Sequence, residues 1–213
     1  MLFRSRHFAI LENEVWGAGY HDGDRDIQES VHTDYDPEWF TLNGRCWPDT
    51  PKPNDRPATS PWPPPAPPAQ SSGITTPNPN YSMAPDKSQP NSALIQANAG
   101  ERVLLRLANL GYRQNAMQLP GIPMHVVGQD ASRLDTPYWT DTLYIGPGEA
   151  RDVLFDAPPH DGSADPYNVY HFKNRDWRKL SNNGASGPGG MMTEVRIYPT
   201  GTLGAQTVVS QVF

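Results

Sequence analysis

The stretch that decides the fold is Ile95-Gln-Ala-Asn-Ala-Gly-Glu-Arg-Val-Leu-Leu-Arg-Leu-Ala-Asn109. In its second half every other residue from Val103 to Leu107 is apolar, while the residues between them include an arginine. Successive side chains of a strand point to opposite faces, so this alternation predicts a strand with one buried face. Ala99-Gly100 just before it is a turn signal. The stretch therefore predicts a strand that is entered through a tight turn.

The same period of two recurs on both sides of this stretch. It places Val153 and Phe155 inward, with Asp152 on the other face, and Val195 and Ile197 inward, with Glu194 and Arg196 on the other face. Further strands are expected at residues 7–11, 39–43, 93–97, 124–127, 140–145 and 167–172, separated by turns rich in Gly, Pro and Asn. About nine short strands without a long helix predict an all-β protein, a Greek-key β-sandwich.

Composition excludes several classes of protein. The chain has 213 residues, enough for one domain, and is 36% hydrophobic with 18 Gly and 24 Pro, which excludes a helical bundle. A net charge of -6 argues against nucleic acid as a partner, and no apolar run is long enough for a membrane span. The single cysteine, Cys46, excludes an internal disulfide and a Cys-rich metal site, and we expect its thiol to pack as a small hydrophobic group.

Proline is concentrated in one part of the chain, because 13 of the 24 prolines fall within residues 51–90. Proline fixes φ and lacks a backbone donor, so this segment is expected to be a long Pro-rich loop insertion with polyproline II character. It is interpreted as a stiff surface insertion, although a partner that reads polyproline could also bind it. Residues 1–200 are thus expected to form a single domain, interrupted by this loop, with residues 201–213 as a C-terminal tail or an extra strand.

The motifs, read in order, resemble the cupredoxin domain of multicopper oxidases. They are Phe-x-x-Asn-Gly at residues 40–44, Gly-Glu-x-Val-x-x-Arg-x-x-Asn at 100–109 and Leu-x-Ile-x-x-Gly-Glu-x-x-Asp-Val at 143–153. The resemblance covers about residues 38–198 and is strongest to the middle domain of the three-domain enzymes. It implies a cupredoxin-like sandwich. It also implies a domain without copper of its own, because middle domains of this kind do no chemistry themselves.

The copper ligands of the family are missing at the matching positions. The chain has no His-x-His pair, which a trinuclear copper cluster requires. The His-Cys-His and Gly-Met elements of the family correspond to Tyr170-His171-Phe172 and Gly190-Met191, where the cysteine is absent. Only His171, Met191 and the strand residue His125 remain as weak metal candidates. We therefore expect no cofactor on this chain, and copper only if a partner domain supplies the ligands, unless scattered histidines converge in the fold.

Three functions remain open. The first is a copper-less domain or subunit that positions the copper-bearing parts of a multicopper-oxidase-like protein, with a periplasmic or extracellular location implied by resemblance. The second is a free-standing interaction module of an extracellular assembly. Its contact would be the uncharged tail with Val208, Val209, Val212 and Phe213, which could also mediate oligomerisation. The third is a copper-dependent oxidoreductase that acts with a partner chain. A protein partner or a larger polypeptide is expected in each case, and the chain alone is not expected to be catalytic.

Overall fold

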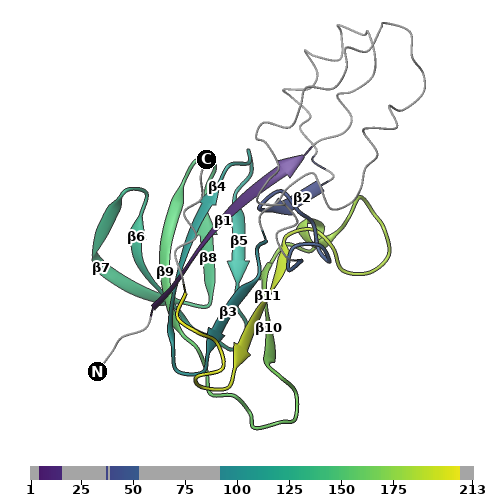
Figure 1. The fold of residues 1–213 in the computed structure, drawn as a ribbon. Coiled ribbons are helices and arrows are strands. Elements are labelled where there is room, and N and C mark those ends of the chain that lie inside the picture. The colour runs from purple at the N-terminus through teal and green to yellow at the C-terminus, as the bar shows by residue number, and fades with distance from the viewer. Residues whose placement is uncertain (1–4, 16–36, 38, 53–91, 207–213) are drawn as a thin grey trace, which may run out of the picture.

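The computed structural model describes residues 37, 39–52 and 92–206, together with the backbone of residues 5–15. These residues form two sheets that pack face to face (Figure 1). The Pro-rich segment expected at residues 51–90 lies almost entirely outside the described residues, and so do the tail residues Val208, Val209, Val212 and Phe213.

The two sheets divide the strands unevenly. The six-stranded sheet has the order β2 (Trp39–Leu42), β1 (Ser5–Val15), β4 (Arg102–Asn109), β9 (Ala150–Asp156), β6 (Met124–Gln129) and β7 (Ser132–Thr140). The five-stranded sheet has the order β3 (Ile95–Asn98), β11 (Met192–Tyr198), β10 (Asn168–Asn174), β5 (Asn115–Gln118) and β8 (Thr142–Ile145). Most neighbours are antiparallel, but β1 runs parallel to β4 and β3 runs parallel to β11. The prediction of an all-β sandwich is confirmed.

The core lies between the sheets, where the period-two pattern placed it. Val103, Leu105 and Leu107 of β4 are buried, as are the alternating residues predicted to face inward on β9 and β11. Side chains from both sheets complete the cluster, the largest fully buried ones being Phe40, Phe155 and Phe172. Apolar burial on this scale is the main source of stability in a sandwich that has little helix.

Two of the sequence motifs are corners where the chain crosses from one sheet to the other. Gly100 and Gly148 adopt φ of +81° and +76°, a left-handed conformation that glycine accepts most readily. The side chain of the glutamate that follows each glycine points back and accepts a hydrogen bond from the backbone N–H three residues earlier. Glu101 Oε2 accepts a hydrogen bond from Asn98 N at 2.8 Å, and Glu149 Oε2 accepts one from Gly146 N at 2.7 Å. Both Gly-Glu pairs therefore close the same kind of turn, one at each end of β4.

The prediction of one continuous strand over residues 140–145 is wrong. The chain changes sheets there, so that β7 ends at Thr140 in the larger sheet and β8 begins at Thr142 in the smaller one. The hydroxyl of Thr140 makes the corner by donating to Thr142 O at 2.7 Å and accepting from Thr142 N at 3.1 Å. Neither β5 nor β7 was among the predicted strands.

The Pro-rich segment leaves and re-enters the domain at a closed stem. Ala93 N donates to Thr50 O at 2.8 Å, and Thr50 Oγ1 donates to Met192 O at 2.6 Å. Thr50 is fully buried, so both ends of the insertion are attached to the edge of the five-stranded sheet beside β11. In the described part of the chain the single helical element is the four-residue 3-10 turn η2 (Trp177–Leu180), and no helix is long and apolar enough to cross a membrane.

Candidate functional site

The three weak metal candidates lie in three different places. Phe172 and Asn174 of β10 face the core, so His171, which directly precedes Phe172, projects from the outer face of the five-stranded sheet. There its ring meets Trp47 edge-on at a centroid distance of 5.8 Å. His125 faces outward from β6 of the other sheet and stacks on Trp139 at 4.4 Å with the rings 9° from parallel. Met191 is fully buried.

These positions do not bring the candidates together. His125 and His171 lie on the outer faces of opposite sheets, and Met191 lies between the sheets. Within the residues that the structure describes, no group of three or more His, Cys, Asp and Glu side chains could hold a metal ion. Metal ligands must converge within bonding distance of one ion, so His125, His171 and Met191 cannot form one site in this fold.

Cys46 lies at the edge of a small cavity of about 230 Å³ that is also bordered by Trp39, Trp47 and Asn182. Its Sγ donates to Phe40 O at 3.4 Å. Burial raises the pKa of the Cys46 thiol to about 11, and the nearby carboxylate of Asp49 adds to the increase. A thiolate is the form that binds metal or attacks an electrophile, so Cys46 is a weak ligand and nucleophile at neutral pH.

A buried polar cluster lies where β5, β10 and β11 meet. We call it the Lys179 cluster, and it consists of Asn115, Asn174, Lys179 and Met191, each at most 4% exposed. The ammonium group of Lys179 donates to Asn115 Oδ1 at 2.7 Å and to the carbonyl oxygen of Gln114 at 2.6 Å. Asn174 Nδ2 donates to the same Asn115 oxygen at 3.1 Å and lies 3.5 Å from Met191 Sδ. The cluster is thus one connected network around a buried lysine.

The local sequence explains how Lys179 becomes buried. Asp176 accepts a hydrogen bond from Arg178 N at 3.0 Å and starts the η2 turn, which points Lys179 inward. The carbonyl oxygen of Lys179 accepts from Met191 N at 2.8 Å, so the loop is closed at its base. Gly190 has a φ of +59°, and a Cβ on it would overlap the carbonyl oxygen of Lys179. The glycine is therefore required by close backbone approach as well as by its conformation.

Sequence reasoning did not identify the Lys179 cluster. One signal was available for Asn174, because it has the same parity on β10 as the inward-facing Phe172. Lys179 gave no such signal, since a lysine within a polar loop is usually exposed. Two amides, an ammonium group and a thioether contain no redox centre and no strong nucleophile. The hydrogen bonds of this cluster join the loop between β10 and β11 to the start of β5.

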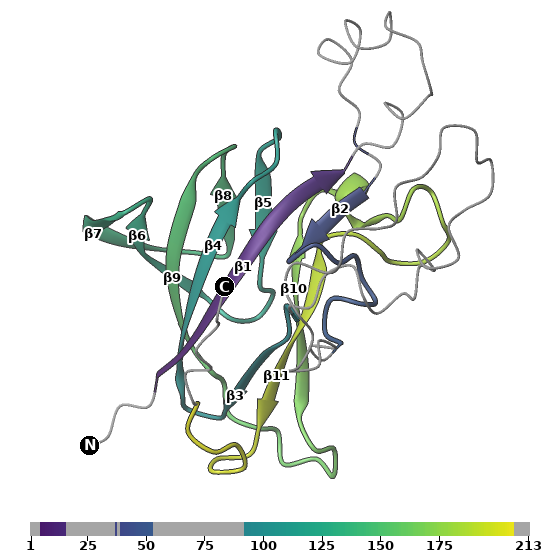
Figure 2. The same ribbon diagram turned by 45° about the horizontal axis from the view of Figure 1, so that its top comes forward.

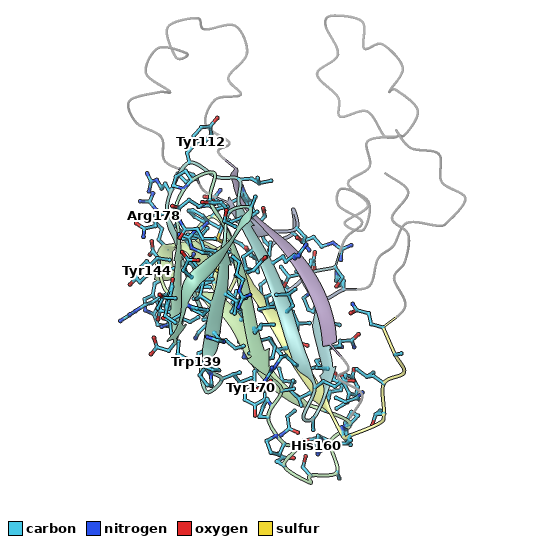
Figure 3. All side chains as sticks on the ribbon, turned by 90° about the vertical axis from the view of Figure 1, so that its left-hand side faces the viewer. Tyr112, Trp139, Tyr144, His160, Tyr170 and Arg178 are labelled. Carbon is cyan, nitrogen blue, oxygen red and sulfur yellow. The ribbon has the colours of Figure 1, made fainter. Side chains whose placement is uncertain are left out.

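Exposed aromatic side chains gather beside the Lys179 cluster. Trp177 on η2 is 84% exposed and Tyr112 in the loop after β4 is 80% exposed, with Tyr144 of β8 about half exposed. Arg175 N donates to Ala116 O at 2.7 Å, which holds the loop after β10 against β5. Figure 3 shows Tyr112, Arg178 and Tyr144 along the same side of the domain. We call Tyr112, Tyr144, Trp177 and Arg178 the aromatic surface.

A second surface feature lies over the six-stranded sheet. The β6–β7 hairpin stands at the side of the domain away from β3, β10 and β11 (Figure 2). Beside it is an open hollow of about 740 Å³ lined by residues of β4, β6, β7 and β9. Arg106 Nε and Asp152 Oδ1, both in its lining, lie 3.6 Å apart; the Arg106 side chain is largely exposed and that of Asp152 partly exposed. Its mixed charges do not point to one class of ligand.

Comparison with known proteins agrees with the resemblance seen in the sequence. Putative laccase-18 of Oryza sativa subsp. indica is 41% identical over 71 residues, which are 32% of this chain and 12% of the rice protein. Laccase-5 of Arabidopsis thaliana is 36% identical over 76 residues, which are 34% of this chain and 13% of that protein. The chain therefore matches about an eighth of the length of these relatives.

Solved structures share the fold at low sequence identity. The blue copper oxidase from Nitrosomonas europaea superposes on 90% of this chain and 43% of its own, with a TM-score of 0.55 and 18% identity. The laccase from Botrytis aclada superposes on 95% of this chain and 30% of its own, with a TM-score of 0.51 and 19% identity. These likenesses confirm the cupredoxin-like sandwich. The family model of the multicopper oxidases matches residues 38–183, and the chain therefore belongs to the multicopper oxidase family.

Proposed function

We propose that this chain is a copper-less cupredoxin domain or subunit of a multicopper-oxidase-like protein, whose role is to position neighbouring copper-bearing parts. The observation that carries the proposal is the Lys179 cluster. The ends of three strands converge on one point, and the groups at that point are an ammonium, two amides and a thioether. Copper in this family is held by imidazole and thiolate ligands, and a buried ammonium group repels a second cation.

Two further features support a positioning role. The chain covers less than half of the structures that it resembles, which is consistent with one domain of a larger protein. The aromatic surface exposes a tryptophan and two tyrosines, residue types that are enriched at protein interfaces. A periplasmic or extracellular location is part of the same proposal.

We expect the purified chain to remain colourless after incubation with Cu(II) and desalting, because among the described residues no cysteine is grouped with two histidines. Elemental analysis should give far less than one copper per chain, and no oxidation of phenols should be detected. The His125→Ala/His171→Ala double variant is the control for loose binding at the surface. Stoichiometric copper with an intense thiolate charge-transfer absorption, retained in that variant, would refute the proposal.

The second candidate function is an interaction module that binds through its tail. Its support is the way in which the chain is attached just before the tail, at Leu203. Leu203 N donates to Asn98 Oδ1 at 2.8 Å, and Asn98 Nδ2 donates to Leu203 O at 3.0 Å. The uncharged sequence with Val208, Val209, Val212 and Phe213 therefore follows a fixed attachment at the corner between β3 and β4. The third candidate, a copper-dependent oxidoreductase that acts with a partner chain, would take its copper ligands from that partner, because the Lys179 cluster offers an ammonium group and amides instead.

Deletion of residues 204–213 should weaken self-association or partner binding and leave the melting midpoint nearly unchanged. The reason is that the paired hydrogen bonds of Leu203 and the strand β11 both precede the cut. Native mass and thermal melting measure the two effects. Deletion of residues 201–213 is the matched control, because it also removes the bonds of Leu203 and should lower the midpoint. A collapsed melt with unchanged assembly in the shorter deletion would show instead that the tail is a strand of this domain.

A further inference from the structure

We propose that the ammonium group of Lys179 is a tethered internal cation that orders the loop between β10 and β11, and that the cradle around it recognises a primary ammonium group, which in this chain is that of Lys179 itself. The cradle is made of two oxygen acceptors from adjacent residues at the start of β5 and one aromatic ring of β2. The carbonyl oxygen of Gln114 and Asn115 Oδ1 lie 2.6 and 2.7 Å from Lys179 Nζ, and the ring of Phe40 lies 5.8 Å away. Short bonds to two oxygens and an aromatic face are typical of ammonium recognition.

The orientation of Asn115 supports a site built around positive charge. Its oxygen accepts from both Lys179 and Asn174, while its buried Nδ2 has no hydrogen-bond partner among the described residues. Leaving a buried amide donor without a hydrogen bond destabilises the folded state. The opposite orientation would place an N–H group against an ammonium ion. The amide thus gives up one hydrogen bond so that its oxygen faces the cation.

Lys179 also joins the buried and exposed sides of one short turn. Its carbonyl oxygen accepts from Met191 N at the far end of the loop, and its side chain crosses to β5. Trp177 and Arg178 of the same turn project outward as part of the aromatic surface. The buried ammonium group is therefore a positioning group that holds this exposed pair against the strands.

The alternative is that only the hydrocarbon stem of Lys179 matters. Lysine buries four methylene groups along apolar surface, and this packing can stabilise a protein without any contribution from the charge. Lys179→Met separates the two explanations, because methionine is of similar length and apolar but has no ammonium group. Lys179→Ala removes both the stem and the charge and leaves room for a small amine.

The experiment measures thermal melting of the full chain in propylammonium chloride and in tetramethylammonium chloride at equal concentration. Tetramethylammonium carries the same charge but has no N–H to donate. We expect Lys179→Met and Lys179→Ala to melt several degrees below the wild type. Propylammonium should then raise the midpoint of Lys179→Ala alone, and should increase its refolding yield if that variant does not fold unaided. For the wild type, the melting midpoint should be the same in the two salts, and the same should hold for Lys179→Met.

Trypsin provides a local readout that does not depend on global melting. Cleavage after Arg178, identified by mass, should be faster in Lys179→Met than in the wild type and should slow in Lys179→Ala when propylammonium is added. If Lys179→Met melts at the wild-type midpoint and is cleaved at the wild-type rate, the hydrocarbon stem alone is enough to order the loop. Equal effects of the two salts on Lys179→Ala would show that the cradle does not recognise an ammonium group. Either result overturns this proposal, and neither involves copper or a partner, so the proposed function stands or fails separately.

Discussion

Replacement of Gly190 by alanine should reduce the free energy of unfolding by more than about 4 kcal/mol, an exceptional loss for the addition of one methyl group. Two costs combine at this position. Gly190 adopts a φ of +59°, which costs an L-residue about 1 to 2 kcal/mol. Its added Cβ would also overlap the backbone carbonyl of Lys179, which cannot move without breaking the bond from Met191 N. Urea denaturation followed by circular dichroism measures the loss.

Gly184→Ala is the matched control in the same loop. Gly184 has a φ of +73°, but no heavy atom lies within 4 Å of the position of its Cβ. It should therefore show only the conformational cost, about 1 to 2 kcal/mol. Equal losses in the two variants would mean that the loop yields around Gly190, and that close packing of Lys179 against the start of β11 is not needed for stability.

The sandwich was predictable because its core strands carry a local signal. On β4, β9 and β11 most inward residues are apolar, and charged residues such as Arg106, Asp152 and Glu194 mark the outer face, so one face could be assigned from the sequence. The edge strand β7 lacks this contrast. Nearly all of its side chains are exposed, including Tyr138 and Trp139, and it contains Pro137, which is more typical of an edge than of a central strand. Its place in the fold depends on pairing with β6, and that pairing is not encoded within the segment.

The candidate site was less predictable for a related reason. The absence of the copper motif and the position of Asn174 on the same face of its strand as Phe172 are local features that can be read from the sequence. The burial of Lys179 depends on three separate elements: the η2 turn, the close approach of Gly190 and the acceptors on β5. The positions of His125 and His171 on opposite sheets likewise follow from topology, since residues 46 positions apart carry no signal of which sheet each strand joins.

Asn109 is the last residue of the Gly-Glu-x-Val-x-x-Arg-x-x-Asn motif at residues 100–109, and its hydrogen bonds explain why an asparagine stands there. It is fully buried, and its Nδ2 donates to Arg113 O at 2.8 Å and to Ile145 O at 3.0 Å. Its Oδ1 accepts from Gly111 N at 3.0 Å. One side chain thus ties the end of β4 to the loop that carries Tyr112 and to the end of β8 in the other sheet.

Asn109→Asp should therefore lower the free energy of unfolding by about 3 to 5 kcal/mol at pH 7, because it places a buried carboxylate against two carbonyl oxygens. These oxygens favour the protonated acid, so the pKa of the new Asp should be higher in the folded state than in the unfolded chain. The loss in free energy of unfolding relative to the wild type is then smallest below about pH 4, where the new Asp is mostly protonated in both the folded and the unfolded chain. The loss grows as the pH rises above the pKa of this Asp in the unfolded chain. Urea titrations between pH 3 and pH 7, compared with the wild type at each pH, test the sign of this pH dependence.

Asn183→Asp makes the same change of charge at an exposed position with a φ of 47° and should have almost no effect on stability at any of these pH values. A deficit in Asn109→Asp that shrinks as the pH rises would mean that the two carbonyl oxygens do not face the side chain, and that Asn109 is not the link between the two sheets.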